Sequence, residues 1–496
     1  MSYQRQFLVA SALILLGLGA RLLFLSAPSL WLDEAASANI AKISVADYFQ
    51  WARGDFHPPL YYLLLHLWSF LGHDEFTLRL FSVISNCLSG IILYFCVRNI
   101  FDPPTALLTL LLFTISPFQI RYSQEVRMYS LLGLWIASIL FFTWQYLKSR
   151  DWPFLLGYTL SATSGLYTHY HAGVFLIVLN MAVVIQLYRT EKALLWPWVL
   201  TQLMTFVLFV PWLPNLIHQI RAGGIAWFPF RPSLPLLISP LFSFLWGDLF
   251  LSILYRPLKP FFLRSAGIGS VIPWIDRLGM AIVLAFVAFI IWKKKRELMR
   301  LSWPTCHTVF LLIGTIGLSF VLSFMSNIYG AARYLFGASL ILYVVIALLL
   351  VALSRFNRKA GIGLTLFVVL IQVLILITYY QPRNHRENWR GAVAYIREHS
   401  KPNQVVGFHF DEPMAPYVYY SDNSIPAFGF IRDGELSPSL VTVSNGRFDV
   451  IWLFDYLAEL YDPAGRVKRQ LAEKGYAPTW HYNFNGVPLT MWTRAG

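Results

Sequence analysis

Long apolar runs with few charges constrain this chain more than any other feature. A membrane-spanning helix needs about 20 mostly apolar residues, since hydrocarbon offers no water to satisfy the backbone. Charged residues make up only 13% of the chain, against about 25% in a soluble domain. We therefore predict a mainly α, polytopic membrane protein with about eleven transmembrane helices, near residues 7–25, 76–98, 104–119, 127–147, 153–169, 171–188, 194–213, 274–292, 304–326, 332–353 and 360–380.

Basic residues predict the orientation of these spans. If the N-terminus is cytoplasmic, the short inner loops carry Arg98, Lys148, Arg189, Lys293 to Arg296, and Arg355 to Lys359, as the positive-inside tendency requires. This account of the net charge of +14 involves no nucleic-acid partner. We expect a multi-pass protein of the plasma (inner) membrane.

The apolar stretch 234–255 must not cross the membrane for this orientation to hold. It contains Pro235 and Pro240, which break a helix interior. We predict a re-entrant or interfacial segment inside an outer loop of about residues 214–273, and a periplasmic or extracytoplasmic C-terminal part.

Composition changes after residue 380, which predicts two domains. Residues 1–380 form the transmembrane domain, whose first outer loop (26–75) contains an amphipathic helix over 35–51 and a second helix over 60–71. Residues 381–496 lack a 20-residue apolar run and predict a small α/β domain. Its expected helices cover 388–399 and 463–474, and its expected strands cover 404–410, 449–454, 479–484 and 488–493.

Two polar motifs lie in the first outer loop. Trp31-Leu32-Asp33-Glu34 follows the first span, and carboxylates at a membrane mouth are costly unless hydrated or paired. Asp33 could instead cap a helix that starts at residue 34 or 35. His57 precedes Pro58-Pro59 and could bind a phosphate, a sugar hydroxyl or a metal, or simply anchor the loop at the interface.

A third motif enters the fourth span. Arg121 and Glu125 are four residues apart and can pair on a helix, while Arg127 and Tyr129 follow directly. So many polar groups at a span are unusual and favour a substrate site. The same residues would also suit a structural ion pair beside an interfacial tyrosine.

Two further motifs occupy predicted outer loops. His169 and His171 join two spans, and both could reach one site from an extended turn. A zinc site and an interfacial aromatic belt are both open there. Arg333 and Tyr334 open the tenth span. The arginine can bind a phosphate through two parallel hydrogen bonds or extend to the interface.

Together these motifs place carboxylates and arginines on one membrane face. That combination suits a phosphate-bearing lipid that meets an acceptor, with a carboxylate as general base. A lipid-carrier or glycan flippase would need polar residues through the membrane depth. The motifs are also compatible with a glycan polymerase or ligase, and with a non-catalytic membrane scaffold.

The order of Trp31-Leu32-Asp33-Glu34, His57-Pro58-Pro59-Leu60-Tyr61-Tyr62 and Gln124-Glu125-Val126-Arg127-Met128-Tyr129 resembles the membrane glycosyltransferases of the GT-C fold. The nearest branch comprises bacterial relatives of the protein O-mannosyltransferases and of the lipid A aminoarabinose transferase. The likeness covers most of residues 1–380.

The resemblance implies a polyprenyl-phosphate-linked sugar donor and transfer at the periplasmic face to a protein, lipid or glycan, with inversion. It implies that Asp33 is the base and Glu34 its supporting neighbour. Arg333 and either Arg121 or Arg127 would hold the phosphate, and Glu125 would orient donor or acceptor.

The resemblance leaves the need for a cofactor open, because some relatives use a divalent metal ion and others do not. The sequence offers Asp33, His57 and Asp248 as ligand candidates, without a second acidic pair to complete a site.

Overall fold

The computed structural model describes residues 2–52, 55–221, 234–247, 302–324, 332–384, 386–421 and 424–494. The chain divides into two units. The helical unit comprises Met1–Leu23, Val45–Leu63 and Leu80–Tyr379, and the sheet unit comprises Phe24–Ser44, Leu64–Arg79 and Tyr380–Gly496. Two segments of the predicted first outer loop, 24–44 and 64–79, thus cluster with the C-terminal residues.

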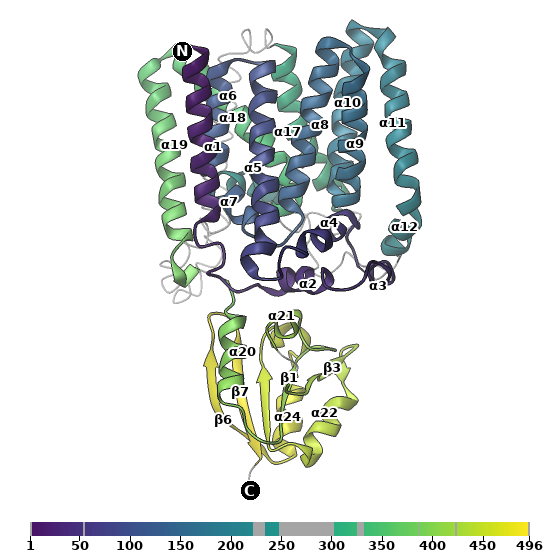
Figure 1. Cartoon of the computed structure of the whole chain (residues 1–496), viewed down its shortest axis with the longest axis vertical. Coiled ribbons are helices and arrows are strands. Elements are labelled where there is room, and N and C mark those ends of the chain that lie inside the picture. The colour runs from purple at the N-terminus through teal and green to yellow at the C-terminus, as the bar shows by residue number, and fades with distance from the viewer. Residues whose placement is uncertain are drawn as a thin grey trace. The chain divides into compact units, whose positions relative to one another are not determined.

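The membrane helices run side by side (Figure 1). Within the described ranges, eight helical stretches are long and apolar enough to cross a membrane, and a bent pair would make a ninth. The predicted span 274–292 lies outside the described residues, and the other predicted spans fall on helical structure. The span 104–119 is divided at Ser116 into two helices. The helices are α1 (Tyr3–Leu22), α5 (Glu75–Ile100), α6 (Pro103–Ile115), α7 (Pro117–Ser123), α8 (Tyr129–Ser149), α9 (Trp152–Thr168), α10 (His171–Thr190), α11 (Leu195–Phe209), α12 (Leu213–Arg221), α17 (Trp303–Leu322), α18 (Phe336–Phe356) and α19 (Arg358–Tyr379).

The bend between α6 and α7 measures 57° and has a local cause. Ser116 precedes Pro117 and is extended, because a following proline disfavours the helical region. Its side chain accepts a hydrogen bond from the Gln119 amide at 3.2 Å, which caps the new helix. The chain therefore changes direction at Ser116 with its backbone donors satisfied.

Polar side chains join four membrane helices in the interior. Arg21 Nε donates to Asn86 Oδ1 at 2.7 Å, Asn86 Nδ2 donates to Gln119 Oε1 at 2.9 Å, and Gln119 Nε2 donates to Ser339 Oγ at 2.8 Å. Such bonds hold helices together where lipid gives no hydrophobic driving force. They fix α1, α5, α7 and α18 relative to one another.

The described part of the 234–255 stretch is the helix α13 (Leu234–Trp246), which contains Pro240. At ~1.5 Å per residue its 13 residues are too short to cross a bilayer. Phe244 is fully buried and packs on Phe118 at 5.0 Å between ring centroids. The re-entrant or interfacial assignment of the whole stretch stays a prediction, because residues 248–255 lie outside the described ranges.

The first outer loop contains α2 (Leu32–Ile40), α3 (Val45–Trp51) and α4 (Leu60–Ser69). The prediction of one helix over 35–51 is wrong, because α2 ends at Ile40. The carbonyl of Ala41 accepts from His66 Nδ1 at 2.8 Å and from Ser69 Oγ at 3.4 Å. These tertiary bonds use an acceptor that a continuous helix would need.

A five-stranded sheet in the order β2-β1-β5-β7-β6 forms the core of the C-terminal domain. Strands β2, β1 and β5 are parallel, and β7 and β6 are antiparallel to their neighbours. Each predicted helix and strand of this domain is present. The strands are β1 (Gln404–Phe408), β2 (Ala427–Gly429), β3 (Ile431–Arg432), β4 (Glu435–Leu436), β5 (Val450–Phe454), β6 (Tyr476–Asn483) and β7 (Pro488–Arg494).

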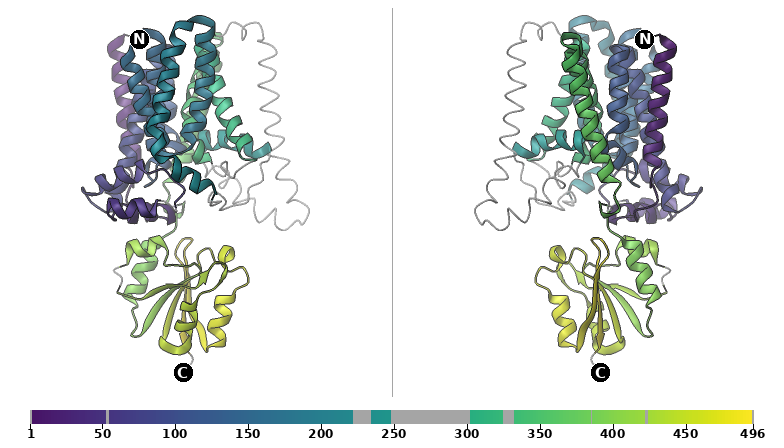
Figure 2. Two further views of the ribbon diagram at one scale, coloured as in Figure 1. Left: turned by 90° about the vertical axis from the view of Figure 1, so that its right-hand side faces the viewer. Right: turned by 90° about the vertical axis from the view of Figure 1, so that its left-hand side faces the viewer.

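Helices cover both faces of this sheet (Figure 2). On one face, Trp389 and Tyr417 pack against Phe408 and Phe454. On the other, the strands pack against α22 and α24. The helices are α20 (Trp389–Glu398), α21 (Ala415–Tyr420), α22 (Pro438–Thr442), α23 (Ala458–Tyr461) and α24 (Arg466–Glu473), and short 3-10 or π turns occupy Lys192–Leu194, Val210–Trp212, Ala332–Leu335, Pro382–Asn384 and Val443–Arg447.

Candidate functional site

Glu34, in the sheet unit, is held by a buried ion pair. Arg79 Nε donates to Glu34 Oε1 at 2.9 Å and Arg79 Nη2 to Glu34 Oε2 at 2.8 Å. Both side chains are at most 3% exposed. A two-bond arginine–carboxylate pair fixes geometry as well as charge. Glu34 is therefore placed to support its neighbours, and its carboxylate is already engaged.

Arg79 also fixes the chain that precedes α2. Its Nη1 donates to the carbonyls of Leu25 and Pro28, both at 2.8 Å, and its Nη2 to the carbonyl of Ser29 at 3.2 Å. One guanidinium thus binds three backbone carbonyls of the loop and the carboxylate of Glu34 in the first turn of α2. The Trp31-Leu32-Asp33-Glu34 motif is built around this arginine, which sequence reasoning missed.

Asp33 lies in the first turn of α2 and is half-buried. The alternative in which Asp33 caps a helix that starts at residue 34 or 35 is wrong, because the helix starts at Leu32 and Trp31 occupies the N-cap position. The amide of Trp31 instead donates to Glu34 Oε2 at 3.4 Å. A carboxylate in the first turn of a helix interacts favourably with the helix dipole, which fixes Asp33 without using it as the cap.

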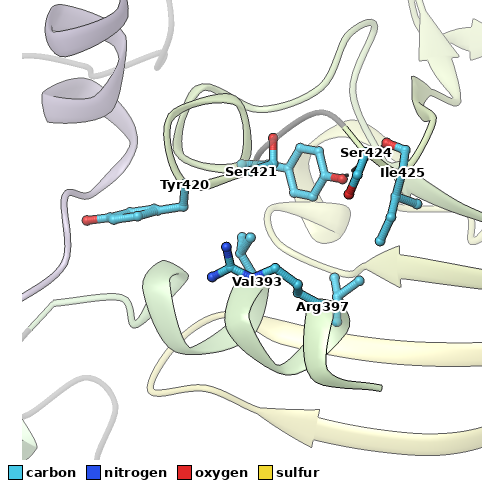
Figure 3. Close-up of a pocket in the computed structure, with 8 residues that line it drawn as sticks. Val393, Arg397, Tyr420, Ser421, Ser424 and Ile425 are labelled. Atoms are coloured by element: carbon cyan, nitrogen blue, oxygen red, sulfur yellow. Dashed lines mark hydrogen bonds between the residues drawn. The ribbon is translucent and has the colours of Figure 1, made fainter. Parts of the chain in front are cut away.

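A pocket lies between α20 and residues 417–421 and 424–425 of the sheet unit (Figure 3). Arg397, Ser421 and Ser424 contribute its polar groups, and Val393 and Ile425 its apolar ones. Tyr420 points out of this pocket toward the chain before α2, where its hydroxyl accepts from the Leu30 amide at 2.7 Å. The pocket wall and the loop are therefore linked.

His57, in the helical unit, lies between a carboxylate and a guanidinium group. His57 Nδ1 is 3.1 Å from Asp55 Oδ2, and His57 Nε2 is 3.3 Å from Arg127 Nη2. Since arginine can only donate, Nε2 accepts and the Nδ1 proton faces Asp55. His57 thus orients Arg127, which is 5% exposed. Asp55 was not among the predicted site residues, although it stands two positions before His57.

Aromatic and cationic side chains from the segments around Tyr129, His169 and Arg333 gather near His57 and Arg127. The His169 ring is 6.4 Å from His57 and 6.1 Å from Tyr129, centroid to centroid. His171 stacks on Tyr334 at 5.8 Å. Arg333 Cζ lies 5.5 Å from the Tyr334 ring and 5.9 Å from the Tyr129 ring. We call this set the cationic cluster: His57, Arg127, Tyr129, His169, His171, Arg333 and Tyr334.

The electrostatics of the cationic cluster follow from its burial and its positive charge. Burial, together with His171, His57, Arg127 and Arg333, lowers the pKa of His169 well below its ordinary value. Burial alone would raise the pKa of Asp55, but His57 and Arg127 outweigh it, and the pKa falls below its ordinary value. An anion in the cluster would therefore meet fixed cations and an ionised Asp55 behind them.

Arg121 and Glu125 form the predicted i, i+4 pair, with Arg121 Nε 3.6 Å from Glu125 Oε1. Arg121 also lies over the Tyr122 ring at 5.8 Å. The charge of Arg121 is thus directed at Glu125. Of the two arginines that the sequence offered for phosphate, Arg127 is the one in contact with His57.

Among the described residues, no three His, Cys, Asp or Glu side chains are grouped so that they could hold a metal ion. Asp248 lies outside the described ranges. Asp33 belongs to the sheet unit and His57 to the helical unit.

Residues 56–214 match the family model described as dolichyl-phosphate-mannose-protein mannosyltransferase. Comparison with curated protein sequences gives no match.

The fold of this chain is similar to that of several solved structures. The Archaeoglobus fulgidus oligosaccharyltransferase tethered with an acceptor peptide is 12% identical, with a TM-score of 0.55 over 100% of this chain and 74% of that one. The same enzyme in complex with Zn and sulfate is 13% identical, with a TM-score of 0.52 over 97% and 72%. ArnT from Cupriavidus metallidurans bound to undecaprenyl phosphate is 13% identical, with a TM-score of 0.48 over 99% and 98%.

Proposed function

We propose that this mannosyltransferase-like membrane protein of the GT-C fold is a glycosyltransferase that moves a sugar from a polyprenyl-phosphate donor to an acceptor. Its fold and the match over residues 56–214 support a glycosyltransferase. The observation that carries the proposal is the cationic cluster, which gathers His57, Arg127, His169 and Arg333 from four distant segments. A phosphate-bearing lipid is the substrate class that such a cluster suits.

In this proposal Arg127 and Arg333 hold the phosphate of the donor. Fixed cations aimed at the oxygen where charge develops can contribute ~3–4 kcal/mol each to the transition state. Because the phosphate leaves as an anion, it needs no proton from an acid. Asp55 and His57 set the direction of Arg127, and Tyr129 and Tyr334 contact Arg333.

Asp33 is the proposed base. It would accept the proton of the acceptor's nucleophile as that atom bonds to the anomeric carbon, while the carbon–phosphate oxygen bond breaks and its electron pair leaves with the phosphate. A single displacement inverts the anomeric centre. Glu34 and Arg79 keep the first turn of α2 in place.

The charge pattern supports an orientation with the N-terminus in the cytoplasm. Lys148 lies in the last turn of α8 and Arg150 directly follows this helix, while Arg189 and Arg355 lie in the last turns of α10 and α18. The cationic cluster lies at the opposite ends of α8, α10 and α18. Under the positive-inside tendency, the cluster then faces the outer side of the inner membrane.

The proposal is tested by separating transfer from transport. Purified protein in liposomes receives radiolabelled polyprenyl-phosphate sugars together with protein, lipid or glycan acceptors. A transferase releases polyprenyl phosphate and labels one acceptor class. Movement of intact donor across the bilayer, without release of polyprenyl phosphate, would instead identify a flippase and overturn the proposal.

A further inference from the structure

The carboxylate of Glu387, in the C-terminal domain, contacts both side chains of that domain and the backbone of the first outer loop. Tyr456 Oη donates to Glu387 Oε1 at 2.9 Å, and Trp389 Nε1 donates to Glu387 Oε2 at 3.4 Å. The amide of Leu32 also hydrogen-bonds to this carboxylate. Leu32 is the first residue of α2, so Glu387 satisfies a backbone donor that the helix itself leaves open.

We propose that Glu387 is a positioning residue for Asp33, because its carboxylate binds the N-terminus of the helix on which Asp33 lies. A negative charge at a helix N-terminus is stabilised by the helix dipole. Glu387 acts here from outside the helix, as Glu34 acts from within it. This inference rests on the proposed role of Asp33 as the base.

Neighbouring contacts hold the same turn from other sides. Ser29 Oγ donates to the carbonyl of Glu387 at 2.5 Å and accepts from the amide of Trp389 at 3.1 Å. The Arg386 guanidinium lies 4.2 Å from the ring centroid of Trp31. The residues before Asp33 are therefore bound to the first residues of the C-terminal domain.

The side chain after Trp31 completes this attachment. Leu32 packs against the apolar core that Trp389 and Phe454 share, and the Trp389 ring contacts Tyr456 at 5.1 Å between centroids. Both side chains that donate to Glu387, Trp389 and Tyr456, are thus fixed by the sheet. A rigid sheet supports the carboxylate, and the carboxylate supports the helix end.

The electrostatics of Glu387 give this contact a pH dependence. Burial raises the pKa of Glu387, and the hydrogen bonds from Tyr456, Trp389 and Leu32, with the charge of Arg386, offset only part of the rise. Burial, Glu387 and Asp33 also raise the pKa of Tyr456, so its hydroxyl keeps its proton and remains a donor. Because this pKa is raised, Glu387 becomes protonated at a pH above the ordinary pKa of a glutamate. Protonation removes the negative charge at the N-terminus of α2.

Hydrogen exchange and kinetics together test this role. In Glu387→Ala, the backbone amides of residues 31–35 should exchange about twofold to thirtyfold faster, the range for loss of a helix cap. The kcat for sugar transfer should fall about tenfold to a hundredfold, since a displaced base reacts poorly, while KM for the lipid donor stays unchanged. Glu387→Gln keeps an acceptor oxygen and should restore part of both, with a kcat that no longer falls at mildly acidic pH.

Glu473→Ala removes an exposed glutamate of the same domain and should change neither quantity. Tyr456→Phe deletes one hydroxyl and provides a milder variant if Glu387→Ala does not fold. Wild-type exchange at residues 31–35 in both Glu387→Ala and Tyr456→Phe would overturn the inference. If both variants exchange faster but the wild-type protein transfers no sugar, the contact of Glu387 with α2 is supported and the proposed function is rejected.

Discussion

Arg79→Met removes the centre of the loop that carries Asp33. The substitution deletes two bonds to Glu34 and three to the carbonyls of Leu25, Pro28 and Ser29. Breaking a buried ion pair by removing one partner costs ~3–5 kcal/mol, because the remaining charge is buried without compensation. Local opening of residues 25–34 should therefore increase about a hundredfold to several thousandfold, at ~1.4 kcal/mol per factor of ten.

Hydrogen exchange is the suitable assay, because the unfolding of a chain with two units is not a single two-state transition. The matched control is Arg355→Met, whose ion pair with Asp102 is exposed, at 66% and 31% for the two side chains. Its loss should cost less than ~1 kcal/mol. Equal protection of residues 25–34 in Arg79→Met and Arg355→Met would refute the reasoning.

A double substitution refines this prediction. Arg79→Met combined with Glu34→Leu removes both charges, and apolar replacement of a whole buried pair is often neutral. The double variant should regain much of the protection that Arg79→Met loses. A further loss in the double variant would mean that the pair does not account for the order of the loop.

Three further predictions concern the cationic cluster and the sheet. Arg127→Gln and Arg333→Gln should each lower kcat/KM by about a hundredfold to a thousandfold, measured with the lipid-linked donor, and an unchanged rate would exclude that arginine from phosphate binding. The pKa of His169 in the folded protein is depressed, so the stability that this residue contributes is present above pH ~6.5 and is lost as the pH falls. The wild-type Tm should therefore be lower at pH 5.5 than at pH 7.5, and this difference should shrink in His169→Asn. Trp389→Ala should destabilise the C-terminal domain by ~3–5 kcal/mol, seen as faster exchange of β1 and β5, whereas an unchanged rate would place Trp389 outside the core.

The sequence predicted features that depend on local pattern. The apolar runs specified the spans, and Asn388 before Trp389 specified the start of α20, where its side chain accepts from the Gly391 amide at 3.0 Å. Each of these signals acts within a few residues, so neighbouring sequence carries it.

Long-range partners could not be predicted in the same way. Glu34 pairs with Arg79, 45 positions away, and Ser29 bonds to Glu387, 358 positions away. An arginine near the start of an apolar span has the same local pattern whether it pairs with a carboxylate or extends to the interface. The break between α2 and α3 likewise depends on His66, a residue outside the helical pattern.

The candidate site shows the same division. Sequence reasoning selected His57, Arg127, His169 and Arg333 one by one, since polar residues at span ends are unusual. Their mutual contacts and the role of Asp55 beside His57 required the fold. Asp55 could have been noticed from its position two residues before His57, but a lone acidic residue in a loop is common.

The most direct measurement is the rate of Asp33→Asn in purified protein supplied with polyprenyl-phosphate sugars. The variant keeps the size of the side chain and removes its basicity, and Asp47→Asn, an exposed carboxylate in the same loop, serves as control. The account predicts a loss of about a hundredfold to ten-thousandfold in sugar release for Asp33→Asn and none for Asp47→Asn. Release of lipid-linked sugar at the wild-type rate by Asp33→Asn would contradict it.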